Sequence, residues 1–103
     1  MLITTTNNIP GKEFEILGLV KGNVVQSKHM GRDFLAGLKN IVGGEIVSYT
    51  EMFSEAREIA TQRMVAEAQS MGADAIIMTR YDSSQVMDST AELIAYGTAV
   101  KFC

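Results

Sequence analysis

The longest regular pattern of apolar positions in the chain runs from Ser48 to Asp82. Apolar side chains recur at helical spacing as far as Gly72, and a short apolar stretch follows at once. Ser48 and Glu51 fit a capping box, in which each side chain satisfies a free backbone N–H of the first helical turn. The pattern therefore predicts a long helix that starts at Ser48, ends at Gly72 and leads into a strand over residues 73–82.

The apolar side chains of this helix form two adjacent stripes on a helical wheel. The first stripe is Phe53, Ala56, Ala60, Met64, Ala68 and Met71, and the second is Met52, Ile59 and Ala66. Together they span about half the circumference, which is wider than a helix on one sheet needs. Either the whole face packs on the sheet and Arg57, Arg63 and Glu67 keep their charged ends in water, or the second stripe meets another subunit and these charges form interface ion pairs.

Residues 14–26 are rich in β-branched and large apolar side chains, which predicts one strand or two. Gly22-Asn23 in the middle is either a two-residue hairpin turn or a bulge in one long strand. We favour the bulged strand, because Val24 to Ser27 is short for an independent hairpin arm. Leu2 to Thr6 is a further, shorter strand candidate.

A second helical pattern covers Met30 to Val42. Asp33 lies in its first turn and Gly43 follows its end, which matches the usual asymmetry of helices. The chain is therefore expected to contain one long and one shorter helix.

The last predicted strand covers residues 90–102, where side chains nearly alternate. Leu93, Ala95, Gly97 and Ala99 share one side, and Ile94, Tyr96, Val100 and Phe102 share the other. In the strand before it, simple alternation places Ala75, Ile77, Thr79 and Tyr81 together on one side. A strand that is apolar on both faces needs cover on both. The helices cover one face, so we expect a second copy of the chain to cover the other.

Composition narrows the class of protein. A length of 103 residues indicates a single domain over residues 1–103. The net charge of −3 and the absence of a basic stripe argue against nucleic-acid binding. No apolar run approaches the ~18 residues of a membrane span, and the first residues lack the pattern of a secretory signal. One cysteine excludes an internal disulfide framework, so we expect a cytoplasmic protein.

Several short motifs follow one another along the chain: Asn40-Ile-Val-Gly-Gly-Glu45, Ser48-Tyr-Thr-Glu51, Glu55-Ala-Arg57 with Arg63-Met64, Gly72-Ala-Asp-Ala75 and Tyr96-Gly-Thr-Ala-Val100. With these motifs the chain resembles the YbjQ-like family of small bacterial proteins over nearly its whole length. The resemblance implies a dodecin-like α+β subunit, with a three-stranded antiparallel sheet and helices, that assembles as a homo-oligomeric ring, commonly a pentamer. It also implies heavy-metal binding, the label that this family carries.

The potential metal ligands are few. Soft metal ions prefer thiolate, imidazole and thioether ligands, and the chain offers Cys103, His29 and seven Met. It has no Cys-x-x-Cys, His-x-x-x-His or Met-x-x-Met pair, so one monomer cannot assemble a four-ligand thiolate or imidazole zinc site. A ring would gather one Cys103 per subunit if the C-termini converged on its axis. His29 is either a partly exposed histidine or a ligand or pH sensor.

Catalytic motifs are missing, since the chain has no nucleophile–base pair and no phosphate loop. We therefore do not expect an enzyme. Ring interfaces form concave pockets, and the side chains expected to line one are Arg57, Arg63, Arg80 and Tyr96. The sequence predicts a homo-oligomer that binds a metal ion or a small ligand. The alternative is a structural oligomer without a ligand, and an unrecognised enzyme ranks third.

Overall fold

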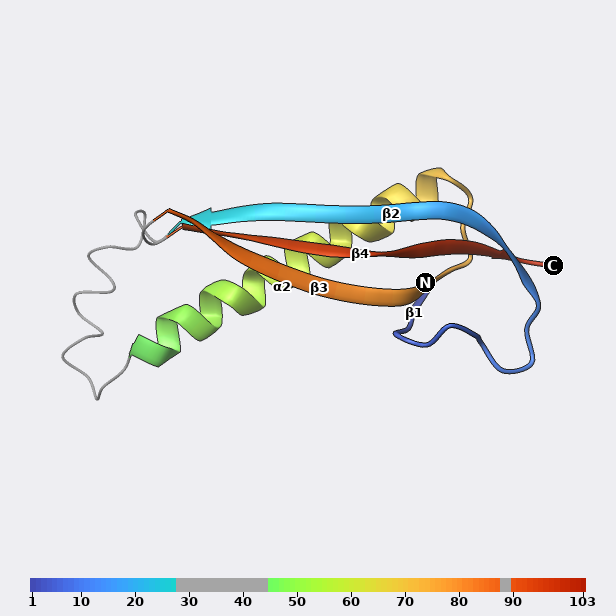
Figure 1. The fold of residues 1–103 in the computed structure, drawn as a ribbon, viewed down its shortest axis with the longest axis horizontal. Coiled ribbons are helices and arrows are strands. Elements are labelled where there is room, and N and C mark those ends of the chain that lie inside the picture. Colours follow the sequence, from blue (N-terminus) through green and yellow to red (C-terminus); the bar gives the residue numbers. More distant parts are fainter. Residues whose placement is uncertain (28–44, 88–89) are drawn as a thin grey trace.

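The computed structural model describes residues 1–27, 45–87 and 90–103. Four strands form one sheet in the order β1-β3-β4-β2, and α2 packs across one face of it (Figure 1). The elements in chain order are β1 (Leu2–Ile3), β2 (Phe14–Ser27), α2 (Glu45–Ser70), β3 (Ala75–Met87) and β4 (Thr90–Phe102). The described part of the chain is therefore α+β, with a helix layer on a sheet layer.

The predicted three-stranded antiparallel sheet is wrong. The sheet has four strands and is mixed, because β1 pairs with β3 in the parallel direction, with Leu2 opposite Ala75 and Ile3 opposite Ile76. The N-terminal segment follows β3 further, since the N–H of Thr79 donates to the carbonyl oxygen of Thr4 at 2.9 Å. The described residues contain one helix, α2. The shorter helix predicted over Met30–Val42 lies outside them.

Helix α2 begins earlier than predicted and ends where predicted. It already includes Glu45, so Ser48 lies within the helix and is not its N-cap. At the other end Gly72 has a φ of +80°, the left-handed conformation that commonly terminates helices. The N–H of Ala73 returns to the carbonyl oxygen of Ala68 at 3.1 Å and closes the last turn. The predicted stop at Gly72 is confirmed.

The main core lies between α2 and the sheet. The first apolar stripe of the helix supplies four buried residues, Ala56, Ala60, Met64 and Ala68. They pack against Val20, Val24, Ile76, Leu93, Ala95 and Ala99 of the three long strands. In the second stripe Ile59 is partly buried against this core, whereas Ala66 is exposed. The sheet therefore covers the first stripe and only the margin of the second.

Strand β2 is continuous through Gly22, which is neither a hairpin turn nor a bulge. Lys21, Gly22 and Asn23 pair in regular register with Tyr96, Ala95 and Ile94. The bulge of this strand lies between Ile16 and Gly18 instead. Gly22 is needed for another reason: a Cβ there would meet the backbone of Ala60 and Met64 on α2. The glycine lets the helix approach the strand closely.

The second face of the sheet is partly covered by the chain itself. At one end Ala75, Ile77 and Val100 are buried, and Ile9 from the N-terminal loop packs on them together with Phe14 and Phe102. The expectation that this face has no cover within the chain is wrong at this end. Further along the face, Ile16 and Leu19 are each 68% exposed and Val25 is 58% exposed.

Strand β3 has a bulge that changes which side chains share a face. The pairing register of β3 with β4 shifts between Ile77 and Arg80, so that Met78 and Thr79 together lie opposite Gly97. Met78 has a φ of +54°, which is unusual for a residue with a side chain. As a result Arg80 follows Ile77 on the face away from α2, and the simple alternation predicted for Ala75 to Tyr81 is wrong beyond Ile77.

Candidate functional site

Helix α2 crosses the sheet obliquely, and its first turns lie beside β3, on the side away from β2 (Figure 1). In the middle of the helix, Thr61 Oγ1 lies 2.7 Å from the hydroxyl oxygen of Tyr81 on β3. Thr61 donates its own proton to the carbonyl oxygen of Arg57, so Tyr81 is the donor in this pair. The contact fixes α2 to β3 where the helix begins to leave the sheet.

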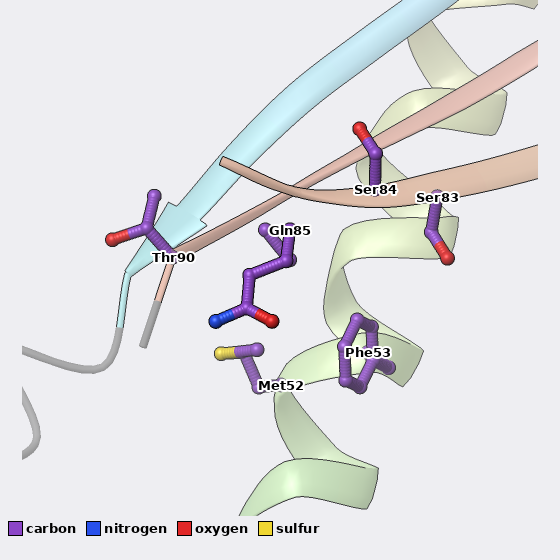
Figure 2. Close-up of a pocket in the computed structure, with 7 residues that line it drawn as sticks. Met52, Phe53, Ser83, Ser84, Gln85 and Thr90 are labelled. Atoms are coloured by element: carbon purple, nitrogen blue, oxygen red, sulfur yellow. The ribbon is translucent and has the colours of Figure 1, made fainter. Parts of the chain in front are cut away.

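A cavity of about 370 Å³ lies where α2 diverges from β3 and β4 (Figure 2). The described residues that line it are Met52, Phe53, Ser83, Ser84, Gln85, Thr90 and Ala91. Figure 2 shows the Gln85 side chain directed from β3 toward Met52 on α2. The volume is within the range of about 300–1,000 Å³ that is typical of small-molecule sites.

The lining of the cavity combines apolar and uncharged polar groups. Met52 and Phe53 present a thioether and an aromatic ring from α2. Ser83, Gln85 and Thr90 supply hydroxyl and amide groups, which both donate and accept hydrogen bonds. The Gln85 Nε2 group lies 3.4 Å from the carbonyl oxygen of Met87, at the long limit of a hydrogen bond. None of the described side chains that line the cavity carries a formal charge.

Sequence reasoning missed the lining residues of β3 because it ended the predicted strand at residue 82. The structure extends β3 to Met87, so Ser83 and Gln85 are strand residues, paired with Leu93 and Ala91. Both strands of this antiparallel pair have 13 residues. The last strand is predicted to be long, and an antiparallel partner should be of similar length. This length could have been used to predict that β3 continues beyond Asp82.

The four predicted pocket residues lie outside the cavity lining. Arg57 donates to Ser54 Oγ at 3.2 Å along α2, and Arg63 donates to the carbonyl oxygen of Asn23 at 2.7 Å. Arg80 donates to the carbonyl oxygen of Thr79 at 2.9 Å. The sheet brings Arg80 beside Tyr96 as a cross-strand neighbour, with Lys21 on the other side of Tyr96. Their role at a subunit interface stays a prediction.

Of the two predicted metal ligands, Cys103 lies in the described part of the chain. Cys103 is exposed after β4, and its N–H donates to the carbonyl oxygen of Glu13 at 3.0 Å. Residues 1–27, 45–87 and 90–103 contain no group of three or more His, Cys, Asp or Glu side chains that could hold a metal ion. His29 lies outside these ranges. The described side chains of one subunit therefore do not fit a metal site.

No helix in the described ranges is long and apolar enough to span a membrane.

Comparison with known proteins supports a family assignment. A family model described as "Putative heavy-metal-binding" matches residues 1–103. A UPF0145 protein of Vibrio parahaemolyticus is 61% identical, covering 98% of this chain and 97% of its own length. A UPF0145 protein of Thermotoga maritima is 59% identical, with coverage of 98% and 96%.

A solved structure shares the fold. It is a protein of unknown function from the DUF74 family of Pediococcus pentosaceus, with a TM-score of 0.65 and 18% identity, over 100% of this chain and 98% of that one. The match of the family model over the full length, together with relatives near 60% identity, confirms the resemblance found in the sequence: the chain belongs to the uncharacterised YbjQ family of UPF0145 proteins.

Proposed function

We propose that this chain works as a cytoplasmic homo-oligomer that binds a small ligand and catalyses no reaction. The observation that carries the proposal is the apolar surface left on the sheet face opposite α2. Ile16, Leu19 and Val25 are each more than half exposed there. Exposed apolar side chains gathered on one face often mark an interaction site.

A second copy of the chain is the partner that this proposal names. The face carries Lys21 and Arg80 beside its apolar side chains, and Asp82 and Glu92 lie further along it. A surface with both charge signs can complement a second copy of itself or a neighbouring patch of that copy. The family resemblance implies a ring of five subunits, which is the assembly that we expect.

Light scattering during gel filtration tests the assembly. At micromolar concentration we expect a mass of several subunits, and five times the subunit mass if the ring forms. Leu19→Lys places a charge in the proposed interface and should yield smaller species. Gln69→Lys, on the exposed side of α2, is the matched control and should leave the mass unchanged. A monomeric wild-type protein would reject the proposal, and full assembly of the Leu19→Lys variant would exclude this face as the interface.

The cargo that the described residues support is a small molecule. Heavy metals need several soft or anionic ligands at one point, and the described side chains provide no such group. The cavity beside Met52 and Phe53 has the volume and lining of a small-molecule site instead. Mass spectrometry of ligands released from purified protein tests for natural cargo, and an oligomer that never carries one would favour the structural alternative.

A thiol ring built from Cys103 of several subunits is the remaining route to metal binding. It makes a sharp prediction, because the chain has one cysteine. Stoichiometric metal binding that Cys103→Ser abolishes would support such a ring. Metal binding that survives Cys103→Ser would reject the thiol ring and require other ligands.

A further inference from the structure

The backbone edge of β2 is occupied by side chains of α2. Glu67 accepts a hydrogen bond from the N–H of Lys21 at 2.9 Å, and Arg63 donates to the carbonyl oxygen of Asn23 at 2.7 Å. Both bonds join residues at least 40 positions apart, so they hold two separate elements together. This part of the β2 edge is therefore closed to an added ligand.

The edge of β3 differs beyond Thr79. The N-terminal segment is bonded to this edge as far as Thr79, and no described strand pairs with this edge after it. The N–H of Thr79 points away from β4, since it donates to Thr4. Backbone groups alternate in direction along a strand, so the N–H of Ser83 points the same way. It donates to Asp82 Oδ1 at 2.9 Å, its own neighbour. Beyond Thr79, no described strand pairs with this side of β3.

This available edge and the cavity share residues. Ser83 and Gln85 belong to the edge segment of β3 and also line the cavity. Figure 2 places them on β3 across from Met52 and Phe53 on α2. The site therefore offers a strand backbone on one side, which pairs with amide groups, and a thioether and an aromatic ring on the other, which pack against apolar or aromatic groups.

We infer that the cavity takes a small uncharged molecule that combines an amide group with an apolar or aromatic body. The amide would pair with the edge of β3 near Ser83 and with the side chain of Gln85. The apolar body would lie against Met52 and Phe53. This inference rests on the proposed function, because it names the class of ligand that the oligomer binds.

Charge selects against an anionic ligand. No lysine or arginine is among the described side chains that line the cavity, and the Asp82 carboxylate accepts a hydrogen bond from the N–H of Ser83, which is a lining residue. Moving a carboxylate from water into such a site costs free energy that no opposite charge repays. A ligand with an amide should therefore bind better than the same molecule with a carboxylate in its place.

The test uses three probes. N-acetyl-L-phenylalaninamide and N-acetyl-L-phenylalanine differ only in the terminal group, an amide or a carboxylate, and propylbenzene carries neither an amide nor a carboxylate. Each is titrated into the wild-type protein while amide NMR signals are followed. We expect saturable shifts centred on Ser83 and Gln85 with the amide probe, and at least roughly tenfold weaker binding of the carboxylate. Propylbenzene should bind weakly without shifting the Ser83 signal. Equal binding of carboxylate and amide, or no saturable shift near β3, would overturn the inference.

Two variants separate the cavity from other surfaces. Ala91→Leu fills the cavity and should abolish binding of the amide probe, whereas Ala66→Leu adds the same atoms at an exposed position of α2 and should not. Gln85→Leu keeps the side-chain size but removes the side-chain amide. It should weaken binding of the amide probe and leave binding of propylbenzene unchanged. Unchanged amide binding in Ala91→Leu would also overturn the inference. The mass of the oligomer is measured on the same samples. A protein that assembles but does not bind the amide probe would contradict only this inference, and the proposed assembly would stand.

Discussion

Gly22 on β2 lies directly against the backbone of Ala60 on α2, with no space between them for a side chain. A Cβ at Gly22 would meet Ala60 and Met64, and would lie 2.7 Å from the Cβ of Arg63. These neighbours are backbone atoms and a Cβ, which cannot rotate away. The spacing between helix and sheet in the centre of the molecule therefore depends on this glycine.

Gly22→Ala should lower the free energy of unfolding by about 3 kcal/mol or more, because overpacking forces the helix and strand apart. Urea denaturation measures the change. Gly11→Ala is a useful comparison, because it also replaces a glycine by alanine but places the new Cβ where no atom lies within 4 Å. Its φ of +79° alone should cost about 1–2 kcal/mol. Equal losses in the two variants would show that the contact with α2 is not what makes Gly22 necessary.

The role of Gly22 shows where sequence reasoning stops. The local sequence predicted either a turn or a bulge at Gly22-Asn23, and both interpretations depend on the conformational freedom of glycine. The structure uses its small size instead, which depends on a helix about 40 residues further along the chain. By contrast, the first stripe of α2 and the stop at Gly72 follow from local periodicity, and both were predicted correctly.

Glu67→Ala should expose the N–H of Lys21 to solvent, because the Glu67 carboxylate is its acceptor at 2.9 Å. We expect faster hydrogen exchange at Lys21 and a loss of about 1–2 kcal/mol in stability. This is the low end for a hydrogen bond to a charged group, because Glu67 is exposed. Amide exchange followed by NMR measures the first effect. Glu58→Ala serves as control, since exposed Glu58 accepts a hydrogen bond from Gln62 of the same helix. If hydrogen exchange at Lys21 were unchanged in Glu67→Ala, the hydrogen bond between Glu67 and the edge of β2 would be contradicted.

Met78→Gly should stabilise the protein by roughly 0.5–1 kcal/mol. The φ of +54° costs a residue with a side chain about 1–2 kcal/mol, and this gain exceeds the entropy that glycine loses in a strand. The Met78 side chain is exposed, so little packing is lost. Thermal unfolding should show a higher Tm for Met78→Gly. Met87→Gly, an exposed methionine of the same strand without positive φ, should lower it, and equal effects would argue against strain at Met78.

The bulge at Met78 also limited prediction of the candidate site. Alternation along β3 holds up to Ile77, and one extra residue then exchanges the faces. Tyr81 consequently reaches Thr61 on α2, and Ser83 and Gln85 follow it toward the cavity. Nothing in the local sequence marks the bulge, because methionine is not a residue that favours positive φ. The mixed sheet escaped prediction for a related reason, since a two-residue parallel strand depends on tertiary contacts.

Thr79→Val should raise the stability of the protein, although it removes a polar group. Thr79 is 3% exposed, and its Oγ1 has no hydrogen-bond partner among the described residues. A buried hydroxyl without a partner costs about 1–3 kcal/mol, and valine fills nearly the same volume. We expect a gain of about 1 kcal/mol, measured by urea denaturation. Thr79→Ser keeps the hydroxyl and removes the methyl group, so it should lose about 1 kcal/mol. A Thr79→Val variant that is less stable than the wild type would show that the hydroxyl is bonded, and that its partner stabilises the bulge opposite Gly97.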